Sequence, residues 1–168
     1  MIEKADITLI QRAVHFKENN ALITPEGSFT YTQLLQASGK IASCLLCRAK
    51  DLHETRVAFV VPSGFHYVVV QWGIWRAGGI AVPLSVSHPI PEMEYVIEDS
   101  DAEIVVSHPD FESKLWPIAQ TTDKRFLLTS DMLETESMPL PHINPNRRAM
   151  ILYTSGTTSK PKGVVTTH

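Results

Sequence analysis

Residues 149–168 read Ala-Met-Ile-Leu-Tyr-Thr-Ser-Gly-Thr-Thr-Ser-Lys-Pro-Lys-Gly-Val-Val-Thr-Thr-His. An apolar run opens this stretch and a β-branched run closes it, so we expect two strands with a loop of small, hydroxylated residues between them. Successive backbone N–H groups in such a loop can form an anion-binding nest, to which hydroxyls and lysines add further donors. The stretch therefore predicts a strand, a polyphosphate-binding loop and a second strand.

A Walker loop is the first alternative for this stretch. That motif requires Gly-x-x-x-x-Gly-Lys-Ser/Thr between a strand and a helix. Counting five residues on from Gly156 reaches Pro161, and Gly163 is followed by Val164, so the spacing does not match. The β-branched residues after Gly163 also favour a strand over the helix that a kinase or NTPase of the Walker type needs.

Residues 153–163 resemble the phosphate-binding loop of the adenylate-forming superfamily, which comprises acyl-CoA synthetases, adenylation domains of peptide synthetases and luciferase-like enzymes. The family pattern is roughly [Tyr/Phe]-Thr-Ser-Gly-[Ser/Thr]-Thr-Gly-x-Pro-Lys-Gly, and Ser159 stands where the family usually has glycine. The resemblance implies that hydroxyl donors, two glycines as turn formers and Lys162 as the cation hold the phosphates of ATP. The implied ATP-binding residues are Thr154, Ser155, Gly156, Thr157, Thr158, Ser159, Lys160, Lys162 and Gly163.

The segment before the loop alternates between short apolar runs and helical patterns. Strands are expected at residues 56–61, 78–84, 103–107 and 125–129, and the first of them has the pattern of a fully buried strand. Residues 65–77 contain a β-branched triplet that favours a strand, but their length favours the helix that we predict. This alternation predicts βαβ units and an α/β fold with a mostly parallel sheet flanked by helices. By resemblance, it is the N-terminal subdomain of an adenylate-forming enzyme.

The N-terminal part carries its own local signals. We expect a helix over residues 7–16 and then a β-hairpin that turns at residues 25–27, which are Pro-Glu-Gly. Thr30 or Thr32 is the expected N-cap of the helix that follows the hairpin, and Asp110 is the expected cap of a later helix. Each of these expectations depends on residues that are close together in the sequence.

The chain divides into three predicted parts. Residues 1–133 form the α/β subdomain, residues 134–148 form an irregular connection with three prolines, and residues 149–168 carry the strand, phosphate loop and strand. The resemblance also implies segments beyond residue 168 that bind adenine, ribose and Mg²⁺ and supply a catalytic lysine. We therefore expect a truncated N-terminal fragment that has no catalytic residues of its own and is inactive alone.

Composition excludes several classes of function. The 168 residues include 15 Lys and Arg against 18 Asp and Glu, a formal charge of −3, so nucleic acid is not an expected partner. The first residues lack the apolar run of a signal peptide and the Arg-rich character of a transit peptide. The apolar segment at residues 65–77 is too short to span a membrane. We expect no membrane span and a cytoplasmic location.

No metal site is expected within this chain. Cys44 and Cys47 have the C-x-x-C spacing, but they lie in a helical pattern without a second ligand pair, so we expect buried or half-buried structural thiols. The seven histidines show no H-x-x-x-H spacing. Metal chemistry, if the complete enzyme uses it, must then come from elsewhere.

The resemblance implies a reaction for the complete enzyme. A carboxylate attacks the α-phosphorus of ATP with the help of Mg²⁺, giving an acyl-adenylate and pyrophosphate, and the acyl group then passes to coenzyme A. The implied partners are a carboxylic acid, ATP and coenzyme A. An acyl-CoA synthetase is the first interpretation. The alternatives are an adenylation domain of a peptide synthetase and a non-catalytic interaction or regulatory domain, and a reading frame that continues past residue 168 into the missing motifs favours an enzyme.

Overall fold

The computed structural model describes residues 6–154 and 160–168. Its main sheet has the strand order β6-β5-β3-β4-β7-β8. Neighbouring strands run parallel, except that β7 and β8 are antiparallel. The α/β fold with a mostly parallel sheet is thus confirmed. The strands are β3 (Arg56–Val60), β4 (Ile80–Pro83), β5 (Ile104–Ser107), β6 (Arg125–Leu128), β7 (Arg148–Thr154) and β8 (Lys162–Thr167).

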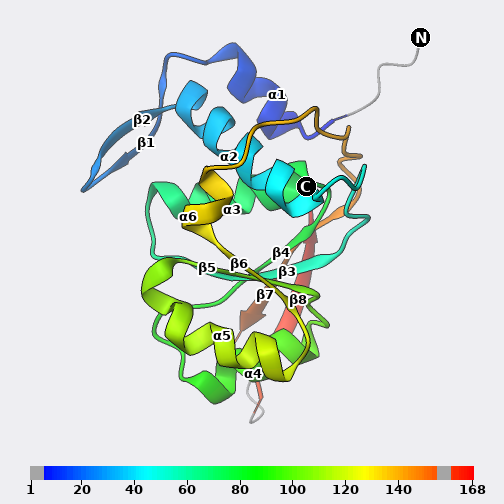
Figure 1. Ribbon diagram of the computed structural model, residues 1–168. Helices are drawn as coiled ribbons and strands as arrows, with labels where there is room; N and C mark the ends of the chain where they lie inside the picture. Colours follow the sequence, from blue (N-terminus) through cyan, green and yellow to red (C-terminus); the bar gives the residue numbers. More distant parts are fainter. Residues whose placement is uncertain (1–5, 155–159) are drawn as a thin grey trace.

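Helices cover both faces of this sheet, as Figure 1 shows. Above it lie α1 (Thr8–His15), α2 (Tyr31–Leu46), α3 (Phe65–Arg76) and α6 (Thr129–Leu133), and below it lie α4 (Ile90–Asp99) and α5 (Glu112–Thr121). Side chains alternate between the two faces of a strand, so each strand can serve two cores. In β3, the buried Val57 and Phe59 pack with the upper layer, while the buried Ala58 and Val60 pack with the lower one.

The helix predicted at residues 65–77 is confirmed as α3. Its burial follows from α2, which packs so closely on it that a Cβ at Gly73 would lie 2.4 Å from Cγ2 of Ile41. The absence of a side chain at Gly73 therefore permits this helix pair. Among residues 6–154 and 160–168, no helix combines the length and the apolar character that crossing a membrane requires.

The hairpin and its cap follow the sequence prediction. Strands β1 (Asn20–Thr24) and β2 (Gly27–Thr30) pair antiparallel. Thr30 is the N-cap of α2 and forms a capping box, because its hydroxyl accepts from the Gln33 N–H at 3.3 Å and its own N–H donates to Oε1 of Gln33 at 2.8 Å. The Thr32 hydroxyl instead donates to the carbonyl of Lys17 at 3.1 Å. Of the two candidate caps, Thr30 is the correct one.

Three local predictions were wrong or incomplete. Asp110 does not cap α5, because it lies inside a 3₁₀ turn (Pro109–Phe111), where its own N–H donates to Nδ1 of His108 at 3.3 Å. The five-residue α6 was missed, since it is too short to show an apolar period. Cys47 is exposed, in contrast to the expected burial, because it leaves α2 in a left-handed conformation, whereas Cys44 is half-buried.

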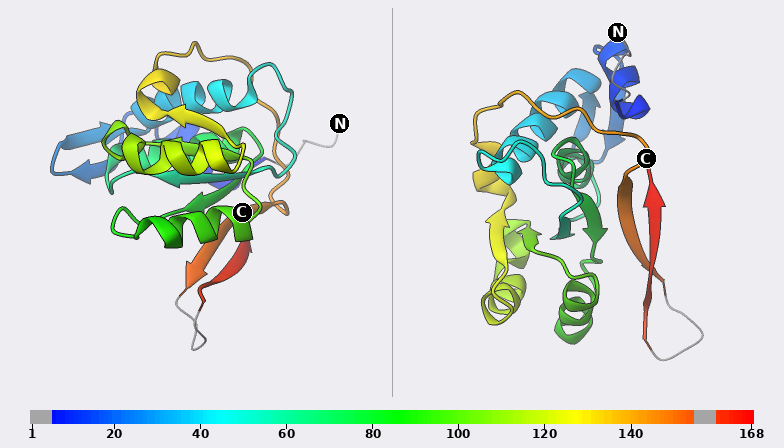
Figure 2. Two further views of the ribbon diagram at one scale, coloured as in Figure 1. Left: turned by 60° about the horizontal axis from the view of Figure 1, so that its bottom comes forward. Right: turned by 90° about the vertical axis from the view of Figure 1, so that its right-hand side faces the viewer.

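The last two strands form a ribbon at the side of the sheet, as the right-hand view of Figure 2 shows. Residues 134–147 contain no helix or strand and lead into β7. β7 then runs parallel to β4, with Met150 opposite Ala81. β8 is exposed along its whole length and lies at the edge of the sheet. The end of β7 and the start of β8 thus lie away from the helices of the upper layer (Figure 2).

Candidate phosphate-binding site

The two strands of the ribbon bring together the ends of the predicted phosphate loop. In the antiparallel register, Thr154 is opposite Lys162 and Tyr153 is opposite Gly163. Thr154, Lys160 and Lys162 are all exposed. Four of the nine predicted ATP-binding residues therefore meet at one end of the ribbon. The other five, Ser155, Gly156, Thr157, Thr158 and Ser159, lie outside the described residues.

Gly163 has a different role from the one expected. The family resemblance implies a turn former at Gly163, but this residue lies within β8, so its place is explained by packing. A Cβ there would come 2.8 Å from Cγ2 of Ile151 and 3.2 Å from Cζ of Tyr153. The Tyr153 ring thus lies close against the backbone of Gly163. Any side chain at residue 163 would force this ring or Ile151 to move.

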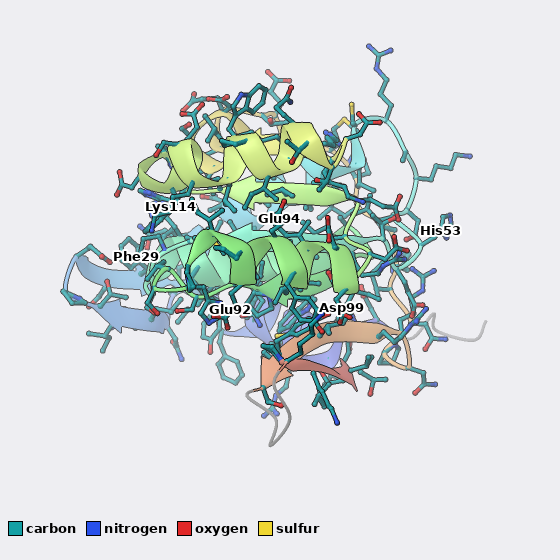
Figure 3. All side chains as sticks on the ribbon, turned by 90° about the horizontal axis from the view of Figure 1, so that it is seen from below. Phe29, His53, Glu92, Glu94, Asp99 and Lys114 are labelled. Carbon is teal, nitrogen blue, oxygen red and sulfur yellow. The ribbon has the colours of Figure 1, made fainter. Side chains whose placement is uncertain are left out.

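Helix α4 supplies two polar side chains at this end of the ribbon, Tyr95 and Asp99, which the sequence pattern does not predict. The Tyr153 hydroxyl donates to Oδ2 of Asp99 at 2.7 Å, and the Tyr95 hydroxyl lies 3.2 Å from the carbonyl oxygen of Pro161. Figure 3 shows Asp99 at the end of α4 beside the ribbon of β7. The only sequence signal was the four-residue spacing of Tyr95 and Asp99, which places both on one helical face.

The electrostatics of this cluster favour neutral tyrosines. Burial raises the pKa of Tyr153 well above its usual range, and the hydrogen bond and charge of Asp99 raise it further. Burial and the nearby Asp99 charge likewise raise the pKa of Tyr95. The ammonium of Lys160 lies 5.1 Å from the centre of the Tyr95 ring, within cation–π range. Both hydroxyls therefore remain hydrogen-bond donors at neutral pH.

The other end of β7 is anchored by ion pairs. Arg147 Nη1 lies 2.8 Å from Oδ2 of Asp51, a side chain that is only 12% exposed. Arg148 binds the carboxylate of Glu54, with Nη2 2.5 Å from Oε2. Both carboxylates precede β3, so these contacts fasten the start of β7 to the beginning of the parallel sheet. β7 is consequently held at both of its ends.

A cavity of about 280 Å³ lies at this anchored end, away from the phosphate loop. Trp75 lines it and donates its indole N–H to the carbonyl of Ala149 at 2.8 Å. The His168 ring meets Trp75 edge-on at 5.6 Å between ring centres. Burial lowers the pKa of His168, and the positive charge of Arg147 lowers it further. The neutral imidazole is therefore favoured, and the cavity wall there is mostly apolar.

The residues at the loop end of the ribbon fit a polyphosphate better than a complete metal site. Two ammonium groups and the Thr154 hydroxyl stand exposed there, the chemistry that phosphate oxygens require. Among the described residues, no three His, Cys, Asp or Glu side chains gather in a way that could hold a metal ion. A Mg²⁺ ion at this end would depend mainly on phosphate oxygens and on other protein groups.

Comparison with known proteins supplies the family. A family model described as AMP-binding enzyme matches residues 9–168. The human protein named malonate–CoA ligase ACSF3, mitochondrial, is 38% identical over 168 residues, which cover 94% of this chain and 29% of that protein. Bacitracin synthase 2 from Bacillus licheniformis is 32% identical over 161 residues, covering 94% of this chain and 6% of the synthase.

Solved structures agree with this match. The crystal structure of ATP-bound MatB from Rhodopseudomonas palustris superposes with a TM-score of 0.81 at 25% identity, covering 97% of this chain and 35% of that one. The present chain thus spans about a third or less of the length of these relatives. The predicted resemblance to adenylate-forming enzymes is confirmed. The chain belongs to the family of AMP-binding enzymes.

Proposed function

We propose that this chain is the part of an ATP-dependent acyl-CoA synthetase that holds the phosphates of ATP. The observation that carries the proposal is the meeting of Thr154, Lys160 and Lys162 at one end of the β7–β8 ribbon. In this proposal, residues 1–133 form the scaffold, residues 134–148 the connection and residues 149–168 the phosphate-binding part.

The chemistry of the site is positioning and charge stabilisation. Lys162 and Lys160 donate charge-assisted hydrogen bonds to the β- and γ-phosphates, and Thr154 adds a neutral donor. The predicted donors Ser155, Thr157, Thr158 and Ser159 complete the set, with Gly156 as a turn former. When bound, Mg²⁺ would help to neutralise the negative charge of the phosphates. Fixing the phosphates aligns the α-phosphorus for in-line attack by a carboxylate oxygen, with pyrophosphate as the leaving group.

The acceptor in the proposal is coenzyme A, and the carboxylic acid substrate is a short one. The name of the human relative describes a malonate–CoA ligase, and its 38% identity exceeds the 32% identity of bacitracin synthase 2. The similarity to the synthase supports a second candidate, an adenylation domain that loads a carrier protein. The two candidates share the adenylation step and differ in the thiol that accepts the acyl group.

Carboxylate-dependent exchange of labelled pyrophosphate into ATP tests the proposal. The assay uses the longest natural protein that contains this chain, a panel of dicarboxylic, fatty and amino acids, and coenzyme A in a second step. Exchange with malonate or another short acid, followed by an acyl-CoA product, is the expected result. A folded protein that shows no exchange with any acid would support the non-catalytic interaction or regulatory domain instead, and exchange with amino acids alone would support the peptide synthetase.

A cytoplasmic location is also part of the proposal. The competing location is the mitochondrion, which appears in the name of the human relative. Fractionation of cells that express the natural protein, with detection by an antibody against this chain, decides between them. Recovery in the mitochondrial fraction would contradict the cytoplasmic location and leave the proposed reaction unaffected.

A further inference from the structure

Two side chains in the second half of α4 contact β7 and the residue that precedes β8. Tyr153, the penultimate residue of β7, donates its hydroxyl to Oδ2 of Asp99 at 2.7 Å. On the other side of the loop, the Tyr95 hydroxyl lies 3.2 Å from the carbonyl oxygen of Pro161, the residue immediately before β8. We call Tyr95, Asp99, Tyr153 and Pro161 the α4 clamp. One helix thus contacts the chain just before and just after the predicted loop.

The clamp has a rigid base. Tyr95 and Asp99 face the ribbon, while Met93, Val96 and Ile97 on the same helix are buried in the lower core. A helix fixed by its buried face presents its other side chains in one orientation. The clamp residues on α4 therefore have a defined position relative to the sheet.

The side chains of the α4 clamp also contact one another. The rings of Tyr95 and Tyr153 meet edge-to-face, at 6.4 Å between centres and an angle of 84°. A phenol has a single proton to donate, and Tyr95 lies 3.3 Å from Oδ1 of Asp99 and 3.2 Å from the Pro161 carbonyl. The Asp99 carboxylate thus binds Tyr153 firmly and shares the proton of Tyr95 with the backbone before β8. The Lys160 ammonium over the Tyr95 ring adds a third link to the same segment.

We propose that Asp99 and Tyr95 are positioning residues that set the two ends of the phosphate loop, an inference that rests on the proposed function. Neither residue touches the phosphates, and each acts through the backbone that carries the phosphate donors. Holding Tyr153 fixes Thr154, and holding Pro161 fixes Lys162, since each donor is the next residue along the chain. A loop anchored on both sides needs less reordering when it binds ATP.

Kinetics of the pyrophosphate exchange reaction test the inference. Asp99→Asn and Tyr153→Phe weaken or remove the strongest contact of the clamp, and Tyr153→Phe keeps the ring that packs on Gly163. We expect kcat/KM for ATP to fall between about tenfold and about a hundredfold, because a small misplacement of a positioned group has effects of that size. The KM for the carboxylic acid should change less than about twofold, since the described clamp contacts are with Tyr153 and Pro161, on either side of the phosphate loop. Glu98→Gln, which removes an exposed charge one residue away, is the matched control and should leave both constants unchanged.

Amide hydrogen exchange provides a readout that does not depend on activity. In Asp99→Asn and Tyr153→Phe, peptides that cover residues 150–165 should exchange faster, whereas peptides from α2 and the Glu98→Gln protein should match the parent. The inference is overturned if the parent enzyme is active and both clamp variants keep its kcat/KM for ATP and its rates of amide exchange. That result leaves the proposed function standing. A parent protein without pyrophosphate exchange contradicts the proposed function, and faster amide exchange in the variants then still shows that the clamp holds the ribbon.

Discussion

The carboxylate of Glu54 binds both the backbone and the side chain of Arg148. Its Oε1 accepts from the Arg148 N–H at 2.8 Å, and its Oε2 accepts from Nε at 2.9 Å. Glu54 lies just before β3, and Arg148 is the first residue of β7, 94 residues later. The hydrogen bonds from the Arg148 side chain and then from its backbone lower the pKa of Glu54. This pair therefore helps to set where the strand that leads to the phosphate loop begins.

Glu54→Gln should lower the free energy of unfolding by about 1 kcal/mol at pH 7, a value reduced because Arg148 is partly exposed. The folded state lowers the pKa of Glu54 below 4.5, so as the pH falls below that value the unfolded state binds more protons. The stability that the Glu54–Arg148 pair contributes is then lost. The free energies of unfolding of the parent and of Glu54→Gln should therefore become equal at acid pH. Urea unfolding at pH 7 and at several lower pH values measures the difference. A deficit that is independent of pH would contradict this account.

Gly78→Ala should disrupt the second anchor of β7. Gly78 has a φ of 82°, and a Cβ there would come too close to Oδ1 of Asp51, the carboxylate that binds Arg147. We expect the free energy of unfolding to fall by about 3 kcal/mol or more, because the substitution strains the backbone and also breaks a largely buried ion pair. Thermal and urea unfolding give the value. Gly27→Ala is the control for backbone strain alone, because Gly27 has a φ of 142° and a Cβ there would have no atom within 4 Å. Equal losses of unfolding free energy in the two variants would refute the role of the ion pair.

Gly163→Ala should displace the Tyr153 ring from β8. The new methyl group would meet Cγ2 of Ile151 at 2.8 Å, and inserting a methyl into a close contact costs about 1–3 kcal/mol. Val164→Ala, on the same strand and 50% exposed, should change stability by about 0.5 kcal/mol or less. Spectrophotometric titration of the tyrosines should also show a lower pKa for Tyr153 in Gly163→Ala. An unchanged pKa of Tyr153 would mean that the position of its ring does not depend on Gly163.

The isolated 168-residue chain should bind ATP or pyrophosphate with a dissociation constant no better than about 1 mM, since a few charge-assisted hydrogen bonds in water supply little net free energy. Lys162→Gln should weaken this binding further, whereas Lys114→Gln, on the distant helix α5, should not. Titration calorimetry at low ionic strength provides the measurement. Micromolar affinity would show that this chain already contains most of the nucleotide site.

Ser159→Gly should leave the activity of the complete enzyme equal or higher. The family pattern has glycine at this position, and glycine adopts positive φ at lower cost than serine does. The measurement is kcat/KM for ATP in the pyrophosphate exchange assay, and Ser87→Gly, at an exposed turn residue, is the control. A large loss in Ser159→Gly alone would instead identify the serine hydroxyl as a specific phosphate ligand.

The sequence alone determined the alternation of strands and helices and the family, and it limited the cap of α2 to Thr30 or Thr32. These features depend on residues that are close together along the chain. Apolar residues repeat every two positions in a strand and every 3.6 positions in a helix, the capping pair is three residues apart, and the family motif is one contiguous stretch. The short helix α6 and the position of Asp110 were not predicted, because segments of three to five residues carry too little periodicity.

Only the tertiary structure decided which side chains contact Tyr153 and Pro161, on either side of the predicted phosphate loop. Asp99 and Tyr153 are 54 residues apart, and their contact exists because β7 inserts beside β4, where α4 covers the lower face of the sheet. The Glu54–Arg148 pair depends on the same strand order. Strand order and register arise from the packing of the whole sheet, so no local pattern encodes these partners. The sequence determined the composition of the loop, and the packing of α4 and β3 decided what anchors its strands.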